Sequence, residues 1–451
     1  MSLIWIVCVC GYAGLQAGAG LRQRLGAGVM VGAGGLLTVQ QALQLALQAA
    51  VVMDAEDVLL EQAAGQRLAT DLLVPQDLPA ADRAMMDGFA VSQPAPAGSE
   101  QDPPAAAVFT VVETVTAGMV PQRVLECGQA ARIMTGALVP TGARCVVPVE
   151  RTSLLAAAAG GAVEQVAVPL ESLKAQAHIL PAGSLARRGD VLLPAGTQIR
   201  AQHIALLAEH GFARIPVHRR VEAAVLATGN ELVHHSETPP PGCIRNSNAP
   251  MLQAQLAAAG AVPRMLRTAS DSLESLRRQI QMGLRADVLL LTGGVSAGIL
   301  DLVPQVLREE GVQQILHGVR MKPGKPLFVG VLRQSGRQCL VFGLPGNPVS
   351  SLACFELFVR PVLERLGGRT TLSSLRALLT RNFTVRGDRT ICQPVQLRLS
   401  EGHLTAEPLA WNSSADLKSA SDANGMAIFE PERGEYVAGE MVQVISWDGW
   451  G

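Results

Sequence analysis

Residues 286–296 read A-D-V-L-L-L-T-G-G-V-S, and the architecture of the chain can be worked out from this segment. Its apolar run ends in a Thr-Gly-Gly turn, which predicts a strand followed by a tight loop. Apolar runs and helical patterns alternate on both sides of it, which predicts a parallel α/β sheet. Strands are expected at 221–227, 262–266, 287–291 and 339–344, and helices at 249–259, 272–283, 301–310 and 348–366.

The rest of the chain lacks this alternation and predicts smaller, β-rich domains. A helix is expected over 39–50 with Thr38 as its N-cap, and short apolar runs between Gly and Pro over 109–149 predict β structure. The Pro/Ala-rich segment 92–107 and the Ala/Gly segment 156–162 are expected to be loops. The predicted fold class is therefore α/β plus β, in several domains. Its expected parts are a disordered or mis-started extension (1–36), β-rich N-terminal and linker domains (37–217), an α/β domain (218–368) and a small C-terminal β domain (369–451).

Composition narrows the class of protein. Of 451 residues 48% are hydrophobic, and 37 Lys and Arg balance 38 Asp and Glu, so no basic excess indicates a nucleic acid partner. Eight cysteines without paired C-x-x-C motifs favour a reducing, cytoplasmic setting over a zinc site or a disulfide framework. The apolar run at 3–10 is shorter than the ~20 residues that span a bilayer. No cation precedes Arg22, so we expect neither a membrane anchor nor a signal peptide.

The loops that follow three of the predicted strands are unusual. They read T-G-N-E at 228–231, T-G-G-V-S at 292–296 and P-G-N-P at 345–348. In a doubly wound sheet, ligands bind beyond the carboxyl ends of the strands. Glycine lets backbone N–H groups approach an anion closely, and Pro348 suits the first turn of a helix whose free N–H groups attract an anion. The three loops together predict an anion-binding edge of the sheet.

Charged residues follow the same strand ends. Glu231, Asp271 and Asp301 follow strands or open helices, and such carboxylates can hold Mg²⁺. M-K-P-G-K-P at 321–326 supplies two lysines, which can bind a phosphate or another oxyanion. Taken singly, each of these features is more often a turn, a helix cap or a solvated group, but their joint occurrence favours a site. The pattern predicts a phosphorylated ligand with a metal, and it leaves open a second anion.

Longer motifs occur together in an order that is typical of one family. From about Leu37 to its C-terminus the chain resembles the molybdopterin molybdenumtransferases, the family of bacterial MoeA and the gephyrin E domain. The first two motifs below separate it from the stand-alone pterin adenylyltransferases, which share only the α/β domain. The motifs are M-D-G-F-A at 86–90, R-I-M-T-G-A at 132–137, T-G-N-E-L at 228–232, I-R-N-S-N at 244–248, G-G-V-S at 293–296, M-K-P-G-K-P at 321–326 and G-L-P-G-N-P-V-S at 343–350.

The resemblance implies an enzyme of molybdenum cofactor biosynthesis that uses adenylylated molybdopterin, molybdate and Mg²⁺ and releases AMP. It also implies a homodimer, in which Asp87 and Thr135 reach the pocket of the partner subunit, and it suggests a molybdopterin adenylyltransferase as a further partner. With the loops described above, it assigns catalysis to Asp87, Thr135, Asn230, Asp271 and Asp301, the last two also as metal ligands. It assigns the binding of adenylylated molybdopterin to Thr228, Gly229, Glu231, Gly293, Gly294, Ser296, Pro345, Gly346, Asn347 and Pro348, and that of molybdate to Lys322, Lys325, Ser350 and Ser414.

Some positions depart from the family pattern. Gly183-Ser184-Leu185 stands where the family carries Gly-Glu-Asp, which removes a glutamate expected at the pocket, and Asp77 and Asp190 are acidic residues close to it in sequence. Arg83-Ala84-Met85 replaces Asn-Ser-Ala, and Leu302 replaces a tyrosine. A second hypothesis is therefore a pterin-binding or scaffold protein without turnover. A third, an adenylyltransferase that uses ATP, is disfavoured by the motifs of the first half. Tungstate would satisfy the same lysines as molybdate.

Overall fold

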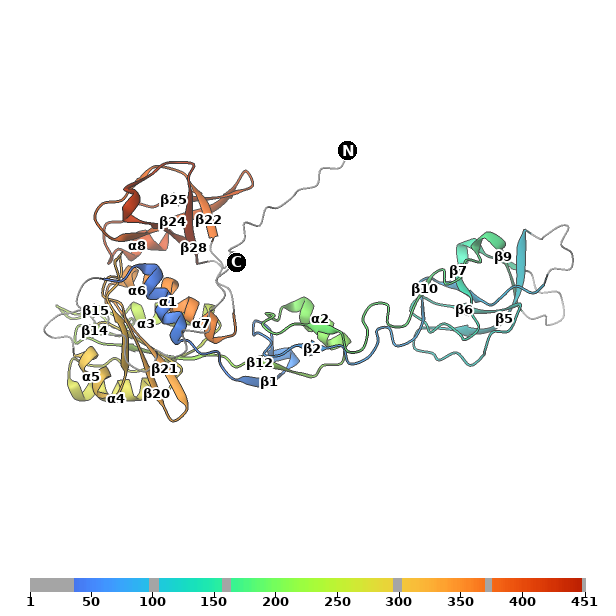
Figure 1. Ribbon diagram of the computed structural model, residues 1–451, viewed down its shortest axis with the longest axis horizontal. Helices are drawn as coiled ribbons and strands as arrows, with labels where there is room; N and C mark the ends of the chain where they lie inside the picture. The colour runs from blue at the N-terminus through green and yellow to red at the C-terminus, as the bar shows by residue number, and fades with distance from the viewer. Residues whose placement is uncertain (1–35, 97–104, 156–163, 295–301, 370–374, 448–451) are drawn as a thin grey trace, which may run out of the picture. The chain divides into compact units, whose positions relative to one another are not determined.

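The computed structural model describes residues 36–96, 105–155, 164–294, 302–369 and 375–447 (Figure 1). These residues belong to two compact units. Unit 1 comprises Met1–Val52, Arg220–Leu366 and Thr371–Gly451, and unit 2 comprises Met53–Arg219 and Gly367–Thr370. The segments 1–35, 156–162 and 97–104, for which an extension and loops were predicted, lie outside the described residues. Within the described part of the chain, no helix has the length and apolar character needed to cross a membrane.

The α/β sheet of unit 1 confirms the predicted parallel strands and adds two antiparallel ones. β20 and β21 form a hairpin through Ser335 and Gly336, whose φ angles of 53° and 77° suit a two-residue turn. Neighbouring β18 then pairs antiparallel with β20. In spatial order the strands are β16 (Val262–Met265), β13 (Glu222–Ala227), β17 (Val288–Thr292) and β21 (Arg337–Leu344), which are parallel, then β20 (Phe328–Gln334) and β18 (Gln313–His317).

The helices of the α/β region also lie where the sequence predicts them. They are α3 (Asn248–Ala258), α4 (Leu273–Gly283), α5 (Val303–Glu309) and α6 (Pro348–Cys354), which continues through a π-helical turn (Phe355–Val359) into α7 (Arg360–Leu366). Helix α1 (Val39–Ala49) begins with the predicted Thr38 cap, since the Thr38 hydroxyl accepts from the Gln41 N–H and the Gln41 side chain accepts from the Thr38 N–H. Because α1 contacts α7, it belongs to unit 1, and the predicted domain 37–217 spans parts of both units.

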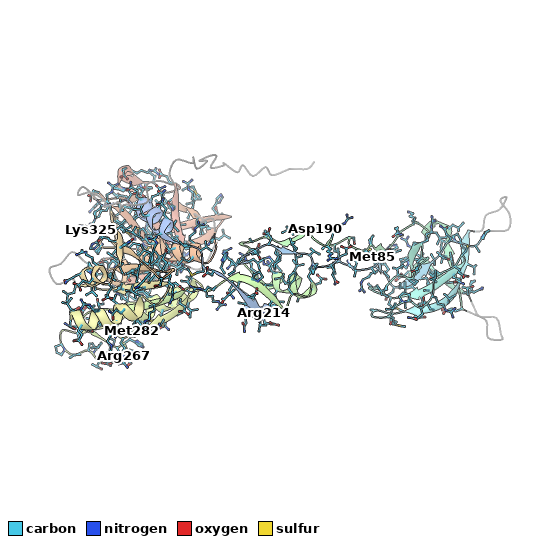
Figure 2. The ribbon with its side chains drawn as sticks, turned by 60° about the horizontal axis from the view of Figure 1, so that its bottom comes forward. Met85, Asp190, Arg214, Arg267, Met282 and Lys325 are labelled. Carbon is cyan, nitrogen blue, oxygen red and sulfur yellow. The ribbon has the colours of Figure 1, made fainter. Side chains whose placement is uncertain are left out.

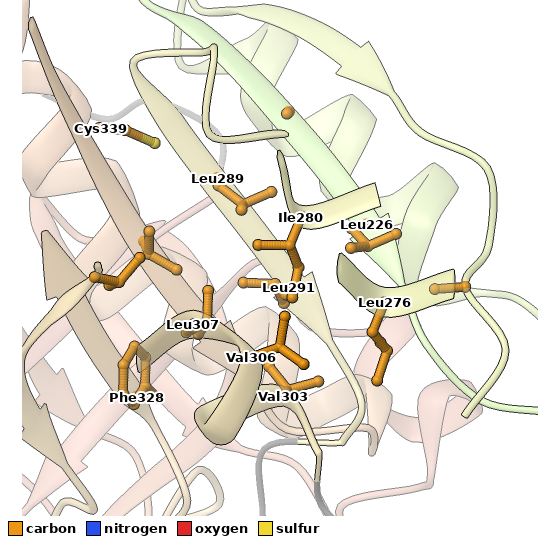
Figure 3. Packing of buried hydrophobic residues seen from close by; sticks show 14 of the residues in the cluster. Leu226, Leu276, Ile280, Leu289, Leu291, Val303, Val306, Leu307, Phe328 and Cys339 are labelled. Carbon is orange, nitrogen blue, oxygen red and sulfur yellow. The ribbon is translucent and has the colours of Figure 1, made fainter. Parts of the chain in front are cut away.

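Leucines of the central strand β17 form the core of the α/β region. Leu289 and Leu291 are fully buried and pack with Leu276 and Ile280 of α4 and with residues of α5 (Figure 3). Burial of one such side chain contributes roughly 1.5–3 kcal/mol, so the apolar run quoted first also holds the helices onto the sheet. This packing fixes the point at which β17 ends and its glycine turn begins.

The C-terminal part of unit 1 is the predicted small β domain. Its core contains Phe429, which stacks on Phe383 with ring centroids 4.1 Å apart and meets Tyr436 edge-on at 4.9 Å. A short helix, α8 (Leu417–Ser421), follows its Ser-Ser-Ala-Asp segment. The sheet order is β19 (Met321–Lys322), β24 (Thr390–Ser400), β25 (His403–Pro408), β22 (Leu375–Leu379), β28 (Met441–Ser446) and β26 (Gly425–Phe429), with the short pair β23 (Phe383–Thr384) and β27 (Glu435–Tyr436) beside it.

Unit 2 is β-rich, as predicted. Its larger sheet is built around β5 (Ala106–Val115), so among the described residues of the predicted loop 92–107 the last two belong to a strand. The sheet order is β7 (Cys145–Pro148), β4 (Gly88–Val91), β6 (Gln129–Ile133), β5 (Ala106–Val115), β9 (Gln165–Pro169) and β8 (Ser153–Leu155). Smaller pairs join β1 (Ala55–Leu59) to β12 (Arg214–His218), β2 (Leu72–Leu73) to β11 (Val191–Leu193) and β3 (Arg83–Ala84) to β10 (Ile179–Leu180), with helix α2 (Ala201–Glu209) between β11 and β12.

Candidate functional site

The loops after β13 and β17 meet at the carboxyl edge of the sheet, as predicted. The Thr228 N–H donates to the Thr292 carbonyl over 3.0 Å, and both threonines are buried. The next residue, Gly229, donates its N–H to the carbonyl of Ala269 over 3.1 Å. The T-G-N-E loop is thereby held between the T-G-G turn on one side and the loop after β16 on the other.

The glycine turn after β17 packs directly against its neighbours. Gly293 has a φ of +91°, and a Cβ added there would lie 2.6 Å from the carbonyl oxygen of Thr228. Its N–H donates to the Leu344 carbonyl over 3.3 Å, and its Cα lies 3.9 Å from where a Cβ of Gly346 would be. The T-G-G turn therefore packs tightly on the T-G-N-E loop, where only glycine permits the approach at Gly293, and it lies beside the P-G-N-P loop.

Asn230 and Asp271 form two reciprocal hydrogen bonds at this edge. The Asn230 N–H donates to Oδ2 of Asp271 over 3.2 Å, and the Asp271 N–H donates to Oδ1 of Asn230 over 3.1 Å. Both residues are exposed, as is Glu231 in the same loop. The two residues come from different loops, and the structure brings these two predicted site residues into direct contact. Ser296 and Asp301 lie outside the described residues.

The lysine loop packs on helix α6. Gly324 has a φ of +113°, and a Cβ there would lie 2.7 Å from Sγ of Cys354, a buried residue of α6. On its other side the loop continues β19, in which Lys322 pairs with Ile391 of β24. Lys322 and Lys325 are exposed, and Figure 2 labels Lys325. Within the ranges that the structure describes, neither lysine forms an ion pair, so both charges are available to an anion.

The two predicted serines lie at helix α6: Ser350 belongs to the helix, and Ser414 belongs to a loop that contacts its N-terminal end. The Asn347 side chain donates to Oγ of Ser414 over 2.7 Å, and the Val349 N–H in the first turn donates to the Ser414 carbonyl over 3.0 Å. Ser350 is buried and lies one turn before Cys354, hence on the helix face that meets the lysine loop. The predicted molybdate residues from three segments therefore converge on the first two turns of one helix.

The loop that carries Ser414 is itself held by a carboxylate. Asp416 caps α8 and accepts from the Ser419 N–H over 3.1 Å and from the Ser419 hydroxyl over 2.8 Å. These bonds, together with those from Asn412, lower the pKa of Asp416 below its ordinary value. Asp416 thus remains ionised at neutral pH and keeps the Ser414 loop in place.

In unit 2 the structure brings together the predicted pair Asp87 and Thr135. Oδ1 of Asp87 accepts from the Thr135 N–H over 2.6 Å and from its hydroxyl over 2.7 Å. These two bonds, the backbone one first, lower the pKa of Asp87. Arg83, one of the departures from the family, donates to the Gly136 carbonyl over 2.6 Å and so supports the same turn. Both members of the pair are exposed, and the remaining described site residues lie in unit 1.

Ser184, the residue in place of the family glutamate, forms a hydrogen bond within its own loop. Its hydroxyl donates to the Pro181 carbonyl over 2.7 Å. A carboxylate does lie beside this loop, because Oδ2 of Asp77 is 3.3 Å from where a Cβ of Gly183 would be, and Oδ1 of Asp77 accepts from the Arg188 N–H over 2.8 Å. Asp190 is exposed at the end of the same segment (Figure 2).

One residue at this edge was not predicted as part of the site. Asn248 is the last residue of the I-R-N-S-N motif and the first of α3. It is buried and donates to Oγ1 of Thr292 and to the carbonyl of Gly346, each over 2.7 Å. The signal in the sequence was a motif with two asparagines, but no local pattern shows that a helix start 44 residues from Thr292 contacts it.

The described residues contain no preformed set of ligands for a metal ion. In the described segments, no group of three or more His, Cys, Asp or Glu side chains is placed to hold a metal ion. Six cysteines in those segments are free thiols, and burial raises the pKa of the Cys339 and Cys392 thiols to about 12.

Comparison with known proteins covers nearly the whole chain. Residues 37–211 match the family "MoeA N-terminal region (domain I and II)", residues 224–365 match "Probable molybdopterin binding domain", and residues 376–447 match "MoeA C-terminal region (domain IV)". The chain is 35% identical over 399 residues to the molybdopterin molybdenumtransferase of Bacillus subtilis (strain 168), a match that covers 87% of this chain and 90% of that protein. It is 30% identical over 413 residues to the molybdopterin molybdenumtransferase of Staphylococcus aureus (strain COL), covering 91% and 95% of the two chains.

Solved structures agree with the sequence matches. The crystal structure of a molybdopterin biosynthesis MoeA protein from Pyrococcus horikosii superposes with a TM-score of 0.76 at 28% identity, and covers 92% of this chain and 100% of that one. A second MoeA structure, from Pyrococcus horikoshii OT3, has a TM-score of 0.70 at 25% identity, with coverage of 91% and 100%. The multidomain fold predicted from the sequence is thereby confirmed.

Proposed function

Since the chain belongs to the molybdopterin molybdenumtransferase family, a family of enzymes in molybdenum cofactor biosynthesis, we propose that it inserts molybdate into adenylylated molybdopterin and releases AMP. In this reaction water cleaves the phosphoanhydride of the substrate to give AMP. The two dithiolene sulfurs bind molybdenum in place of oxygen ligands of molybdate, and each departing oxygen leaves as water with protons from the thiols and the solvent.

The observation that carries the proposal is the convergence on α6. The Gly346–Gly293 contact lies just before its N-terminus, and the Ser414 loop and the lysine loop pack on its first turns. The residues proposed for the pterin adenylate are thereby adjacent to those proposed for molybdate. Lys322 and Lys325, which form no ion pair within the part of the chain that the structure describes, favour an anion, and Ser350 and Ser414 can donate hydrogen bonds to an oxyanion.

Mg²⁺ is the proposed metal ion, with Asp271 and Asp301 as its protein ligands. Oδ2 of Asp271 accepts from the Asn230 N–H, while its other carboxylate oxygen has no hydrogen-bond partner among the residues that the structure describes. Such a carboxylate fits Mg²⁺, which uses one or two protein carboxylates and takes its other ligands from phosphate and water. The ion would neutralise charge on the phosphoryl group that is cleaved.

The proposal includes a homodimer and a supply of substrate. Asp87 is held in one orientation by Thr135 and is exposed, which suits a group that acts on the site of a partner subunit.

The substrate must come from a reaction that joins AMP to molybdopterin, so a molybdopterin adenylyltransferase is the proposed supplying partner. Free cysteines favour the cytoplasm as the location.

The test is AMP release by the purified full-length chain. With adenylylated molybdopterin and Mg²⁺, we expect AMP to appear when molybdate is added. Lys322→Ala and Lys325→Ala should each raise the molybdate concentration at half-maximal rate by about tenfold or more, since each removes a charge-assisted hydrogen bond. Lys418→Ala is the matched control, because Lys418 is 83% exposed and forms an ion pair with Asp422 at the surface. An absence of molybdate-dependent AMP release from the unmodified chain would contradict the proposal.

The second candidate, a pterin-binding protein without turnover, is favoured by Ser184 alone. Its hydroxyl is bonded within its own loop and offers no carboxylate. If this candidate is right, the unmodified chain binds molybdopterin but releases no AMP, and Ser184→Glu restores release without changing pterin affinity. Rapid turnover by the unmodified chain would exclude it.

A further inference from the structure

The surroundings of Asn248 fix the orientation of its side-chain amide. It is 8% exposed, and its amide nitrogen lies 2.7 Å from both Oγ1 of Thr292 and the carbonyl oxygen of Gly346. A backbone carbonyl only accepts hydrogen bonds, so the nitrogen and not the oxygen of the amide must face Gly346. The amide oxygen is buried and has no hydrogen-bond partner among the described residues.

Asn248 does not serve α3 as its cap. The N-cap residue is Ser247, and a side-chain bond to the first turn comes from Asn246, whose Oδ1 accepts from the Ala249 N–H over 3.1 Å. Both donors of Asn248 instead point away from its own helix, one to the end of β17 and one to the loop before α6. A buried, unpaired amide oxygen is unfavourable, so the gain from this residue lies in the two bonds that its nitrogen donates.

These two bonds complete a series that crosses the site. Thr228 bonds to Thr292, and Thr292 and Gly346 are joined through Asn248. Asn347, the residue after Gly346, then bonds to Ser414. The series runs from the glycine turn proposed for the nucleotide to the serine proposed for molybdate, and Asn248 is the side chain that links its two halves.

We propose that Asn248 is a positioning residue that couples the nucleotide half of the site to the molybdate half. The inference rests on the proposed function for the identity of the two ligands. It predicts that removal of the amide loosens both halves at once, including the Ser414 contact, which Asn248 does not touch.

The experiment compares Asn248→Ala with Gln255→Ala in the full-length chain. Gln255 is the matched control because it lies two turns along the same helix, has a buried unpaired amide oxygen as well, and bonds to Glu356 instead of to the site. Thr292→Val is a milder third variant, which removes one acceptor of Asn248 and retains the shape of the side chain.

Two readouts decide the outcome. In the ligand-free chain, amide hydrogen exchange at Gly293 and Val349 should be faster by about fivefold or more in Asn248→Ala, by a smaller factor in Thr292→Val, and within about twofold of wild type in Gln255→Ala. Calorimetric titration with molybdate alone and with AMP alone should show both affinities reduced about fivefold or more in Asn248→Ala and unchanged in the control.

The inference is overturned if a folded Asn248→Ala chain exchanges its Gly293 and Val349 amides within twofold of the wild-type rates. It is also overturned if Gln255→Ala increases these exchange rates as much as Asn248→Ala does. If Asn248→Ala does not fold, the same comparison is made with Thr292→Val, for which wild-type exchange at both amides overturns it. If the wild-type chain binds neither ligand, the proposed function fails, and the exchange comparison still decides the role of Asn248.

Discussion

Substitution of Gly293 by alanine tests the central contact of the site. The residue combines a φ of +91° with a space that a methyl group cannot occupy, since its Cβ would lie 2.6 Å from the carbonyl oxygen of Thr228 and 3.1 Å from its hydroxyl. The carbonyl belongs to backbone that is held by hydrogen bonds to Thr292 and Ala269, so it cannot move aside as a flexible side chain would.

The magnitude follows from two contributions. The left-handed conformation costs an alanine about 1–2 kcal/mol. Forcing a methyl group into a packed region costs about 1–3 kcal/mol more. Gly293→Ala should therefore lower the free energy of unfolding by about 2–5 kcal/mol. Gly260→Ala is the matched control, because Gly260 has a φ of +80° and no atom within 4 Å of its would-be Cβ, so only the first contribution applies.

Urea denaturation followed by tryptophan fluorescence measures the difference. Trp411 and Trp447 lie in the described part of unit 1, so a change in their fluorescence reports on the unit that contains Gly293. The variant should also lose affinity for AMP, while Gly260→Ala retains it. Equal stabilities of the two variants, within about 0.5 kcal/mol, would refute the reasoning, since the contact with Thr228 would then contribute nothing.

Three further predictions concern other contacts. Glu356→Gln removes one of the two carboxylates, Glu356 and Glu364, that stabilise the charge of the half-buried Arg360, and it should lower the free energy of unfolding by about 1–3 kcal/mol in the same urea assay, where an unchanged midpoint would exclude a role for the ion pair. Because the pKa of Asp87 is lowered in the folded chain, the ionised carboxylate stabilises the fold at pH values above the unfolded pKa, and this stabilisation is lost as the pH falls through the folded pKa. An NMR titration should place the Asp87 midpoint below 3.8. Thr135→Val should raise that midpoint only in part, because the backbone donor remains. Ser414→Ala should weaken molybdate binding about fivefold in calorimetry, with Ser413→Ala as the control that remains near wild type; equal losses in both would instead indicate general loosening of the loop.

The elements of the α/β region were predictable because their signals are local. Buried parallel strands are nearly continuously apolar, so the apolar residues 223–227 and 288–291 within the predicted strands are visible without knowledge of their neighbours. Helix starts are equally local: Thr38 and Ser272 each accept a hydrogen bond from the first turn of the helix they precede. The hairpin partner β20 was not predicted, since no helix separates it from the strand it joins.

The order of residues along the chain was sufficient to predict which loops carry chemistry, because glycine, proline, lysine and aspartate in such motifs reflect constraints on nearby backbone. It could not show that Asn248 joins Thr292 to Gly346, that Asp87 is held by Thr135, or that the Ser414 loop rests on the first turn of α6. Those contacts join residues tens of positions apart, and they exist only after strands and helices have packed and brought their ends together. Hydrogen bonds depend on distance and direction in space, and a linear sequence specifies neither until the chain has folded.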